Sequence, residues 1–344
     1  MEVIFASSSN HNSWDEYVSN NANASAYHQW AWLATVEQAY KFSVYRLMAI
    51  ENGKTVGVFP LAYIKKPFMA GKLSSLPYCD LGGVLADSDE IKQQLLAEAF
   101  KLGAEKSIAK IEYRTHAARD REPSTLQKVR MVLPLPSSSE ELMQSFKSKL
   151  RSQIRKATKN GLTASTGNDK AHLDGFYQVY CKNMRDLGSP AHSFQWFQSI
   201  VENYKENAVI ANVYFKGEVI GAGLILVNNQ ACVIPWASTN GDYNKLAPNM
   251  LLYWTLLSYA SDNGITSFDF GRSTPGEGTY KFKAQWGAQP QGLDWYDFYQ
   301  GKPVIESAGV GNNRLRPLIE KLWCKLPVGV ATGMGSSLRK YISL

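Results

Sequence analysis

The sequence predicts an α+β fold built from two similar units that are related by internal duplication. Three observations support this prediction. The chain has 344 residues, a length typical of about two domains. A segment at residues 29–57 is repeated in altered form at residues 195–221. Both copies show the same succession of helical and strand patterns.

The repeat is recognised from short matched motifs that keep their order along the chain. Gln29-Trp30 corresponds to Gln195-Trp196 at an offset of 166 residues, and farther on Arg114 corresponds to Arg272 at an offset of 158. Small loop deletions produce such a gradual decrease in offset. The two halves are therefore predicted to share one topology.

Each copy opens with an aromatic-rich helix, followed by two strands that a turn with glycine connects. A third strand contains a proline, Pro77 in the first copy and Pro235 in the second. Because proline has no N–H for the ladder, the sheet is expected to be interrupted there, although an ordinary edge strand is the alternative. A helix, at residues 91–101 and 247–262, and a further strand complete each copy.

Composition excludes several classes of protein. With 44% hydrophobic and 19% charged residues, the chain is neither disordered nor embedded in a membrane. No apolar stretch reaches the roughly 18 residues of a transmembrane helix, and the N-terminus does not resemble a signal peptide. The four cysteines lack C-x-x-C spacing, which predicts buried thiols. We therefore expect a cytoplasmic protein.

The net charge of +7 is concentrated in two segments, residues 145–161 and 312–344. A capping pattern at Ser138 and a stop at Asn160-Gly161 predict one helix over the first segment. On this helix the basic residues form a row, which indicates binding of phosphate or another anion; a solvated face is the alternative. The row comprises Lys147, Arg151 and Arg155, and the predicted apolar face comprises Leu142, Phe146, Leu150, Ile154 and Ala157.

The glycine-rich segment FDFGRSTPGEGTYKFKAQWGA has the composition of a functional loop. Lys281 and Lys283 flank Phe282, so in an extended chain both lysines point to one side and favour an anion between them. Arg272 ends the preceding strand, and Asp269 is a candidate base or the support of a backbone turn. For the lysines, a surface strand with a buried aromatic residue is the alternative.

Familiar catalytic motifs are missing from the sequence. It contains no G-x-S-x-G, H-E-x-x-H or P-loop motif, and its five histidines lack metal-ligand spacing. These features favour a metal-free mechanism that relies on positioning and electrostatics.

Several motifs together resemble the Fem family of tandem proteins with the acetyltransferase (GNAT) fold. They are HQWAWL, RKATKNGL, KLAPNMLLYWTLLSYASDNGITSFDFGRS and TYKFKAQWGA, and the resemblance covers roughly residues 20–300. It is strongest to the FemAB-related branch found with bacterial exopolysaccharide and PEP-CTERM export systems. The resemblance implies two GNAT-like domains, at residues 1–137 and 138–299, and we expect residues 300–344 to pack back on the first.

The resemblance implies an acyltransferase or aminoacyltransferase that forms an amide on an amine of an anionic cell-envelope or exopolysaccharide precursor, such as a peptidoglycan precursor. The implied donor is aminoacyl-tRNA, with no tightly bound cofactor. The implied acceptor is an anionic glycan, a nucleotide sugar or a lipid-linked molecule, with peripheral contact to the inner membrane. The segment GDYNKLAPN lacks the loop that binds coenzyme A pyrophosphate in acetyl-CoA-dependent relatives.

Two alternatives remain open at this point. One is an N-acyltransferase of a sugar amine that uses acyl-CoA or an acyl carrier protein. The other is a non-catalytic protein that binds anionic lipid or nucleic acid through its basic segments, including an amphipathic helix near the C-terminus.

By resemblance, Phe282 and Lys283 lie beside the reacting carbonyl and are the catalytic residues. Lys283 would stabilise the oxyanion, so its removal is expected to abolish transfer without lowering the melting temperature. No metal site is implied. The residues expected to bind substrate are Arg272, Tyr280, Lys281, Trp286, Trp236, Arg151, Arg155 and Lys156.

Overall fold

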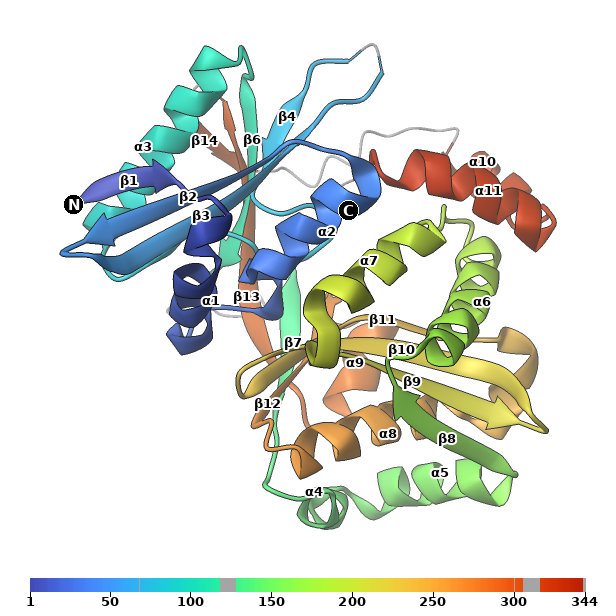
Figure 1. Cartoon of the computed structure of the whole chain (residues 1–344). Coiled ribbons are helices and arrows are strands. Elements are labelled where there is room, and N and C mark those ends of the chain that lie inside the picture. Colours follow the sequence, from blue (N-terminus) through green and yellow to red (C-terminus); the bar gives the residue numbers. More distant parts are fainter. Residues whose placement is uncertain (68, 118–127, 300, 306–315, 343–344) are drawn as a thin grey trace. The chain divides into compact units, whose positions relative to one another are not determined.

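The computed structural model describes residues 1–67, 69–117, 128–299, 301–305 and 316–342. The chain forms two compact units (Figure 1). The first unit comprises Met1–Lys128, Gln291–Gly311 and Tyr341–Leu344, and the second comprises Val129–Pro290 and Asn312–Lys340.

The first unit is a sheet with helices on both faces. Its strands follow the order β1-β2-β3-β4-β6-β13, with β14 beside β13 and β5 beside β3, and the β4–β6 pair is parallel. The strands are β1 Glu2–Phe5, β2 Val44–Glu51, β3 Lys54–Ile64, β4 Lys72–Ser74, β5 Leu85–Ala86, β6 Lys110–His116, β13 Gln289–Tyr299 and β14 Lys302–Ile305. The α-helices are α1 His11–Asn20, α2 Trp30–Tyr40 and α3 Asp89–Glu105.

Strand β2 shows how the sequence builds the two faces of this sheet. Successive side chains of a strand point to opposite faces. Leu47 therefore joins the core under α3, while its neighbour Met48 packs with Trp14 of α1. Both faces of β2 are buried, which explains its nearly continuous apolar sequence.

The second unit repeats this plan. Its strands follow the order β8-β9-β10-β11-β12-β7, and the β11–β12 pair is parallel. The strands are β7 Val129–Pro134, β8 Leu162–Gly167, β9 Ala208–Phe215, β10 Glu218–Asn228, β11 Ala231–Thr239 and β12 Ser267–Ser273. The α-helices are α4 Ser139–Ser145, α5 Ser148–Lys159, α6 Lys170–Asp186, α7 Phe194–Tyr204, α8 Pro248–Asp262, α9 Gly278–Ala284, α10 Arg316–Trp323 and α11 Val328–Arg339.

The predicted duplication is confirmed by this topology. In each unit two antiparallel pairs lead to a parallel pair, and a long helix connects the parallel strands: α3 between β4 and β6, and α8 between β11 and β12. The predicted α+β class and the tandem arrangement are therefore correct.

The last strand of each sheet departs from the domain boundaries expected from the sequence. β7 follows β6 along the chain but pairs with β12, whereas β13 follows β12 but pairs with β6. Each unit thus takes its last strand from the other half of the chain, so units with boundaries at residues 137/138 and 299 are not what the structure shows. The partner of a strand depends on long-range pairing, which its own sequence does not encode.

The C-terminal helices also differ from expectation, because α10 and α11 belong to the second unit and not to the first. The Arg185 guanidinium donates to the Leu326 carbonyl oxygen at 3.1 Å, between the two helices. Gly335 of α11 lies against the backbone of Ala191. Residues 306–315 of the predicted C-terminal segment lie outside the described residues.

The thiols of Cys79, Cys181 and Cys232 are buried and free, as predicted, and Cys324 is half-buried. In the described part of the chain, no helix has the length and apolar character needed to cross a bilayer.

Candidate active site

The candidate site begins where the parallel strands β11 and β12 separate. They pair only from Ala231–Ser267 to Val233–Asp269. Beyond that point β11 continues beside β10 with a bulge at residues 234–235, and β12 continues beside β7 with its own irregularity. The predicted interruption at Pro235 is thus confirmed. It opens the second sheet between two strands whose backbone groups have lost their mutual partners.

The bulge of β12 is held by the Asp269 carboxylate. Its Oδ1 accepts a hydrogen bond from the Gly271 N–H at 2.8 Å, and its Oδ2 lies 3.4 Å from Arg130 Nη1 of β7. Gly271 has a φ of +74°, a conformation that glycine adopts without steric cost. Asp269 therefore supports a backbone turn, which is the second of the two roles considered for it.

Lys283 lies within hydrogen-bonding distance of this bulge. Its ammonium donates to the carbonyl oxygens of Gly271 at 3.0 Å and Arg272 at 2.8 Å, and only 8% of the residue is exposed. The buried ammonium is a fixed positive charge at the end of β12, in the part of the strand that no longer pairs with β11. The side chain does not project into bulk solvent.

The extended conformation expected around Lys283 is wrong, because residues 278–284 form helix α9. Positions two apart on a helix are separated by about 200°. Lys281 is accordingly exposed while Lys283 is buried, so the two ammonium groups do not share an anion. Tyr280 precedes them on the same helix and is half-exposed.

Aromatic side chains surround α9. Tyr253 of α8 stacks on Phe270 of β12 at a centroid distance of 5.5 Å, and Phe282 meets its edge at 5.1 Å. Trp286 packs against Phe146 at 5.5 Å and is 1% exposed. Trp286, which the sequence placed among the substrate-binding residues, is therefore a buried residue of the core behind the site.

Tyr253 was missed by the sequence reasoning. Burial raises the pKa of its phenol from 10 to about 12, so the hydroxyl stays protonated even in moderately alkaline solution and can donate a hydrogen bond. Its sequence signal is weak, since it is one aromatic residue in a largely apolar helix. Only packing on β12 and α9 distinguishes it.

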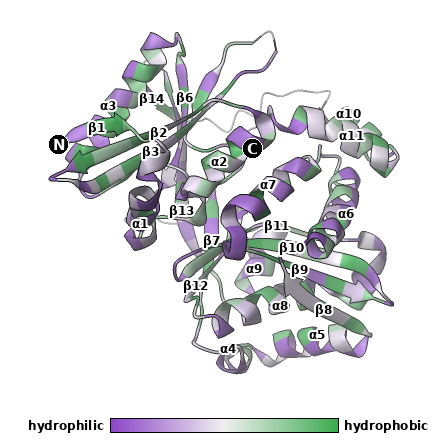
Figure 2. Ribbon diagram, viewed as in Figure 1, coloured by the Kyte–Doolittle hydropathy of each residue, from purple (hydrophilic) through white to green (hydrophobic). Residues whose placement is uncertain are grey.

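The predicted basic helix is two helices, α4 and α5, separated by extended residues Phe146 and Lys147. The predicted start is confirmed, since Ser138 Oγ accepts from the Glu141 N–H at 3.2 Å. Its five predicted apolar residues are buried, and α5 alternates between hydrophilic and hydrophobic residues in Figure 2. The break allows Phe146 to reach both Trp254 and Trp286.

The basic residues of α5 point away from this aromatic cluster. Arg155 and Lys156 are exposed, and Arg151 donates to the Gln144 carbonyl oxygen at 3.2 Å across the α4–α5 turn. α5 contributes to the site through Phe146, its neighbour in sequence. The structure thus brings together Arg272, Phe282, Lys283 and Trp286, and it leaves the α5 cations on a separate surface.

Trp236 of β11 packs against α7, and in Figure 1 α6 and α7 lie together on one face of the second sheet. Its ring meets Phe197 at 4.9 Å and His192 at 6.0 Å. Burial, together with the charge of Arg339, lowers the pKa of His192 well below its ordinary value, so this ring is neutral. α9 lies with α8 on the other face, so Trp236 and Phe282 border the opening from opposite sides.

The corresponding opening in the first unit is filled by its own chain. Arg114, the counterpart of Arg272, is 5% exposed and donates to the carbonyl oxygens of Leu76 at 3.2 Å and Cys79 at 2.8 Å. The segment after β4 therefore occupies the space beside β6. For this reason we assign the candidate site to the second unit.

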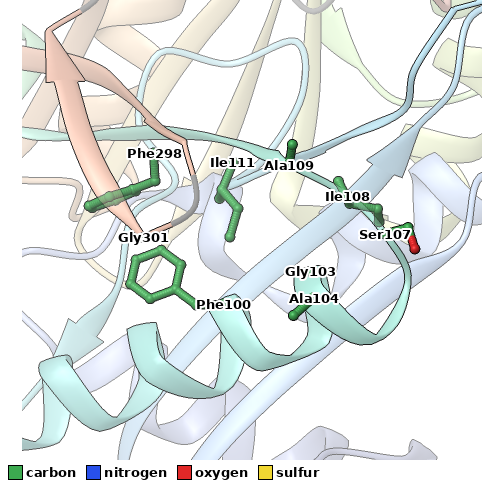
Figure 3. Close-up of a pocket in the computed structure, with 9 residues that line it drawn as sticks. All are labelled: Phe100, Gly103, Ala104, Ser107, Ile108, Ala109, Ile111, Phe298 and Gly301. Atoms are coloured by element: carbon green, nitrogen blue, oxygen red, sulfur yellow. The ribbon is translucent and has the colours of Figure 1, made fainter.

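A separate cavity of about 530 Å³ lies in the first unit (Figure 3). It carries no charged side chain and offers no group for acyl transfer. Its lining residues are Phe100, Gly103, Ala104, Ser107, Ile108, Ala109, Ile111, Phe298 and Gly301. Across the described ranges, His, Cys, Asp and Glu side chains form no group of three that could hold a metal.

Comparison with known proteins agrees with this location of the site. The acetyltransferase (GNAT) domain family matches residues 144–284, which include α5, β12 and α9. The crystal structure of FemX superposes with a TM-score of 0.68 at 16% identity, covering 93% of this chain and all of that one. The lipid II:glycine glycyltransferase of Staphylococcus epidermidis is 21% identical over 406 aligned positions, which cover 90% of this chain and 93% of the relative. The chain thus contains a match to the GNAT acetyltransferase domain, and over nearly its whole length it is similar to Fem-type tandem GNAT proteins.

A second solved structure supports the tandem fold of this chain. The tandem GNAT protein from the clavulanic acid biosynthesis pathway has a TM-score of 0.51 at 10% identity, with 88% of this chain and 99% of that one covered. The GNAT match ends at Ala284, the last residue of α9. Lys283 and Phe282 thus fall inside the matched domain.

Proposed function

We propose that this Fem-type acyltransferase moves an aminoacyl group from aminoacyl-tRNA to an amine of a lipid-linked cell-envelope precursor. Support for the acceptor class comes from the lipid II:glycine glycyltransferases, which the chain matches over nearly its whole length. An amine of an exopolysaccharide precursor is the alternative acceptor, because the same amide-forming reaction would modify it.

The observation that carries the proposal is the buried ammonium of Lys283 at the bulge of β12. In the reaction the acceptor nitrogen attacks the ester carbonyl carbon of the donor. A C–N bond forms, the C–O bond to the ribose breaks, the amine loses a proton and the departing oxygen gains one. A fixed positive charge beside the opening stabilises the negative charge that develops on the carbonyl oxygen.

Other side chains of the site hold the reactants. The partly buried Phe282 packs against the Tyr253 ring beside the bulge of β12, and Tyr280 is half-exposed on the same helix as Phe282. Arg272 is half-buried at the end of β12, where it can approach an anionic group of a substrate. Confinement of both reactants contributes much of the rate in reactions of this kind.

The start of α8 favours a donor other than coenzyme A. Helix N-termini bind phosphate through free backbone N–H groups. Here Pro248 occupies the first turn and has no N–H, while the N–H of Ala247 already donates to Asn244.

Transfer assays with the full chain test the proposal. Purified protein is incubated with a pool of aminoacyl-tRNAs and lipid II, with an exopolysaccharide amine, and separately with acyl-CoAs, and the acceptors are analysed by mass spectrometry. We expect a mass increase of one aminoacyl residue on the lipid-linked acceptor, with loss of charged tRNA. Acylation from acyl-CoA without consumption of charged tRNA would contradict the proposed donor.

A lysine pair provides the internal control for this assay. Lys283→Met should lower the rate about 10²–10³-fold, the usual effect of removing one oxyanion-stabilising group. Lys170→Met changes a lysine of α6 whose side chain is 82% exposed and should leave the rate unchanged. Equal rates for both variants would remove Lys283 from the mechanism.

A further inference from the structure

Helices α10 and α11 expose most of their large apolar side chains. In the described residues thirteen large hydrophobic side chains are exposed, and seven of them lie between Leu318 and Ile342. Val330, Met334 and Leu338 are spaced four residues apart and therefore line one side of α11. The C-terminal apolar face consists of Leu318 (55% exposed), Ile319 (51%), Leu322 (58%), Val330 (48%), Met334 (48%) and Leu338 (47%).

The packing of α11 is the reverse of what is usual for a helix that covers a domain. Such a helix normally turns its larger apolar side chains inward. In α11 the small residues Ala331 and Gly335 face the unit, and a Cβ added to Gly335 would lie 2.7 Å from the Ala191 backbone nitrogen. The larger side chains are left outside, so the fold of this unit does not itself account for them.

The two helices are firmly attached, which makes their outer side a defined surface. Trp323 of α10 is 8% exposed, and Arg185 of α6 bonds to the Leu326 carbonyl oxygen at the turn between the helices. Residues 316–340 contain five lysines and arginines and one acid, Glu320. Lys321 and Lys325 are exposed beside Leu322, so positive charge borders the apolar face.

We propose that the C-terminal apolar face, with Lys321 and Lys325, docks the protein on the surface of an anionic lipid bilayer. Apolar residues on one side and lysines at the border are the pattern of helices that lie in the membrane interface. A second copy of this chain is a poorer occupant. In a two-fold contact both copies would contribute Lys321 and Lys325, and Glu320 is the one acid of residues 316–340 that could offset them.

Vesicle co-sedimentation of the full chain tests this docking without donor or acceptor. We expect binding to vesicles of phosphatidylglycerol and phosphatidylcholine, and little binding to phosphatidylcholine alone. Binding should fall in about 1 M salt, where the screening length is about 3 Å. Because no transfer is measured, failure of docking leaves the proposed reaction standing, and failure of the reaction leaves docking standing.

Three variants separate the contributions. The triple variant L322S/M334S/L338S should weaken binding at least tenfold, by loss of apolar burial. K321Q/K325Q should weaken binding to the anionic vesicles roughly 25-fold, because each lysine near such a surface contributes about fivefold. The control F5S/M69S/V304S removes side chains of similar exposure (54%, 59% and 48%) from the first unit and should bind like the wild type.

Two results would overturn the proposal. One is that the triple variant binds vesicles as strongly as the wild type, while melting temperatures show that all variants are folded. The other is a lipid-free dimer in light scattering that the triple variant, and not the control, converts to a monomer. In that case a second copy covers the face.

Discussion

The Nζ atom of Lys283 both donates hydrogen bonds to the backbone and carries the positive charge proposed to act in the reaction. Replacement of Lys283 by methionine separates these two roles. Methionine fills a similar volume but has no charge and no N–H donor. In the wild type the ammonium satisfies the carbonyl oxygens of Gly271 and Arg272 at 3.0 and 2.8 Å. The substitution leaves both acceptors without this donor.

The expected loss of stability follows from the burial of these groups. A buried acceptor without a partner costs about 1–3 kcal/mol. Gly271 is buried and Arg272 is half-buried, so the second carbonyl can be hydrated, and removal of the ammonium also relieves the cost of its own burial. We expect a net loss of about 2 kcal/mol, which lowers the melting temperature by about 4–8 °C for a unit of this size.

This expectation replaces the one from the sequence, which foresaw no change in melting temperature. Calorimetry measures the transition, and transfer is measured well below it, where the variant is folded. A melting temperature equal to that of the wild type would refute the hydrogen-bonding argument. A lowered melting temperature with an unchanged rate would show that Lys283 supports the bulge and takes no part in the reaction.

Three further predictions concern stability. Although burial raises the pKa of Glu112, Arg114 and two lysines outweigh burial and hold that pKa below its usual value of 4.5. The ionised Glu112 carboxylate therefore stabilises the folded protein fully above about pH 4.5, and this contribution is lost as the pH falls through the folded-state pKa. The urea midpoint of the wild type should drop in that pH range. The midpoint of Glu112→Gln should drop less. Asp269→Asn keeps an oxygen for the Gly271 N–H, whereas Asp269→Ala does not, so the alanine variant should lose about 1–3 kcal/mol in urea unfolding and the asparagine variant less. Gly335→Ala should lower the melting temperature, while Gly333→Ala, with open space around its Cβ, should raise it by the helix propensity of alanine.

Each of these predictions has an outcome that contradicts it. A pH profile of Glu112→Gln that parallels the wild type would mean that another group causes the acid sensitivity. Equal urea midpoints for the two Asp269 variants would show that the hydrogen bond to the Gly271 N–H does not stabilise the bulge. A stabilising Gly335→Ala would show that α11 does not lie directly on the Ala191 backbone.

Local signals predicted much of the fold. The matched motifs revealed the duplication, Pro235 marked the bulge that opens the sheet, and Ser138 marked a helix start that the structure confirms. These features depend on residues close together in sequence: a missing N–H, a capping hydroxyl and a repeated pattern. The residues that lie together at the opening were also largely named in advance, including Lys283 and Phe282.

The errors concern long-range contacts. The two-residue alternation at Lys281 and Lys283 suggested a strand, but Phe282 packs against α8 from helix α9, and Trp286 packs against Phe146 from the turn that follows it. Tyr253 acquires its place at the site only by packing against β12 and α9. Helix propensity and local pattern are weak beside such packing.

The amino-acid sequence by itself determined the tandem α+β plan, the break at Pro235 and the identity of the lysine at the candidate site. Tertiary structure alone decided that β7 and β13 exchange sheets, that the opening of the first unit is filled by its own chain, and that Lys283 bonds to two carbonyls of β12. The physical reason is that caps, turns and repeats involve neighbouring residues. Strand partners and buried hydrogen bonds join residues far apart in the chain, and only the folded molecule brings these together.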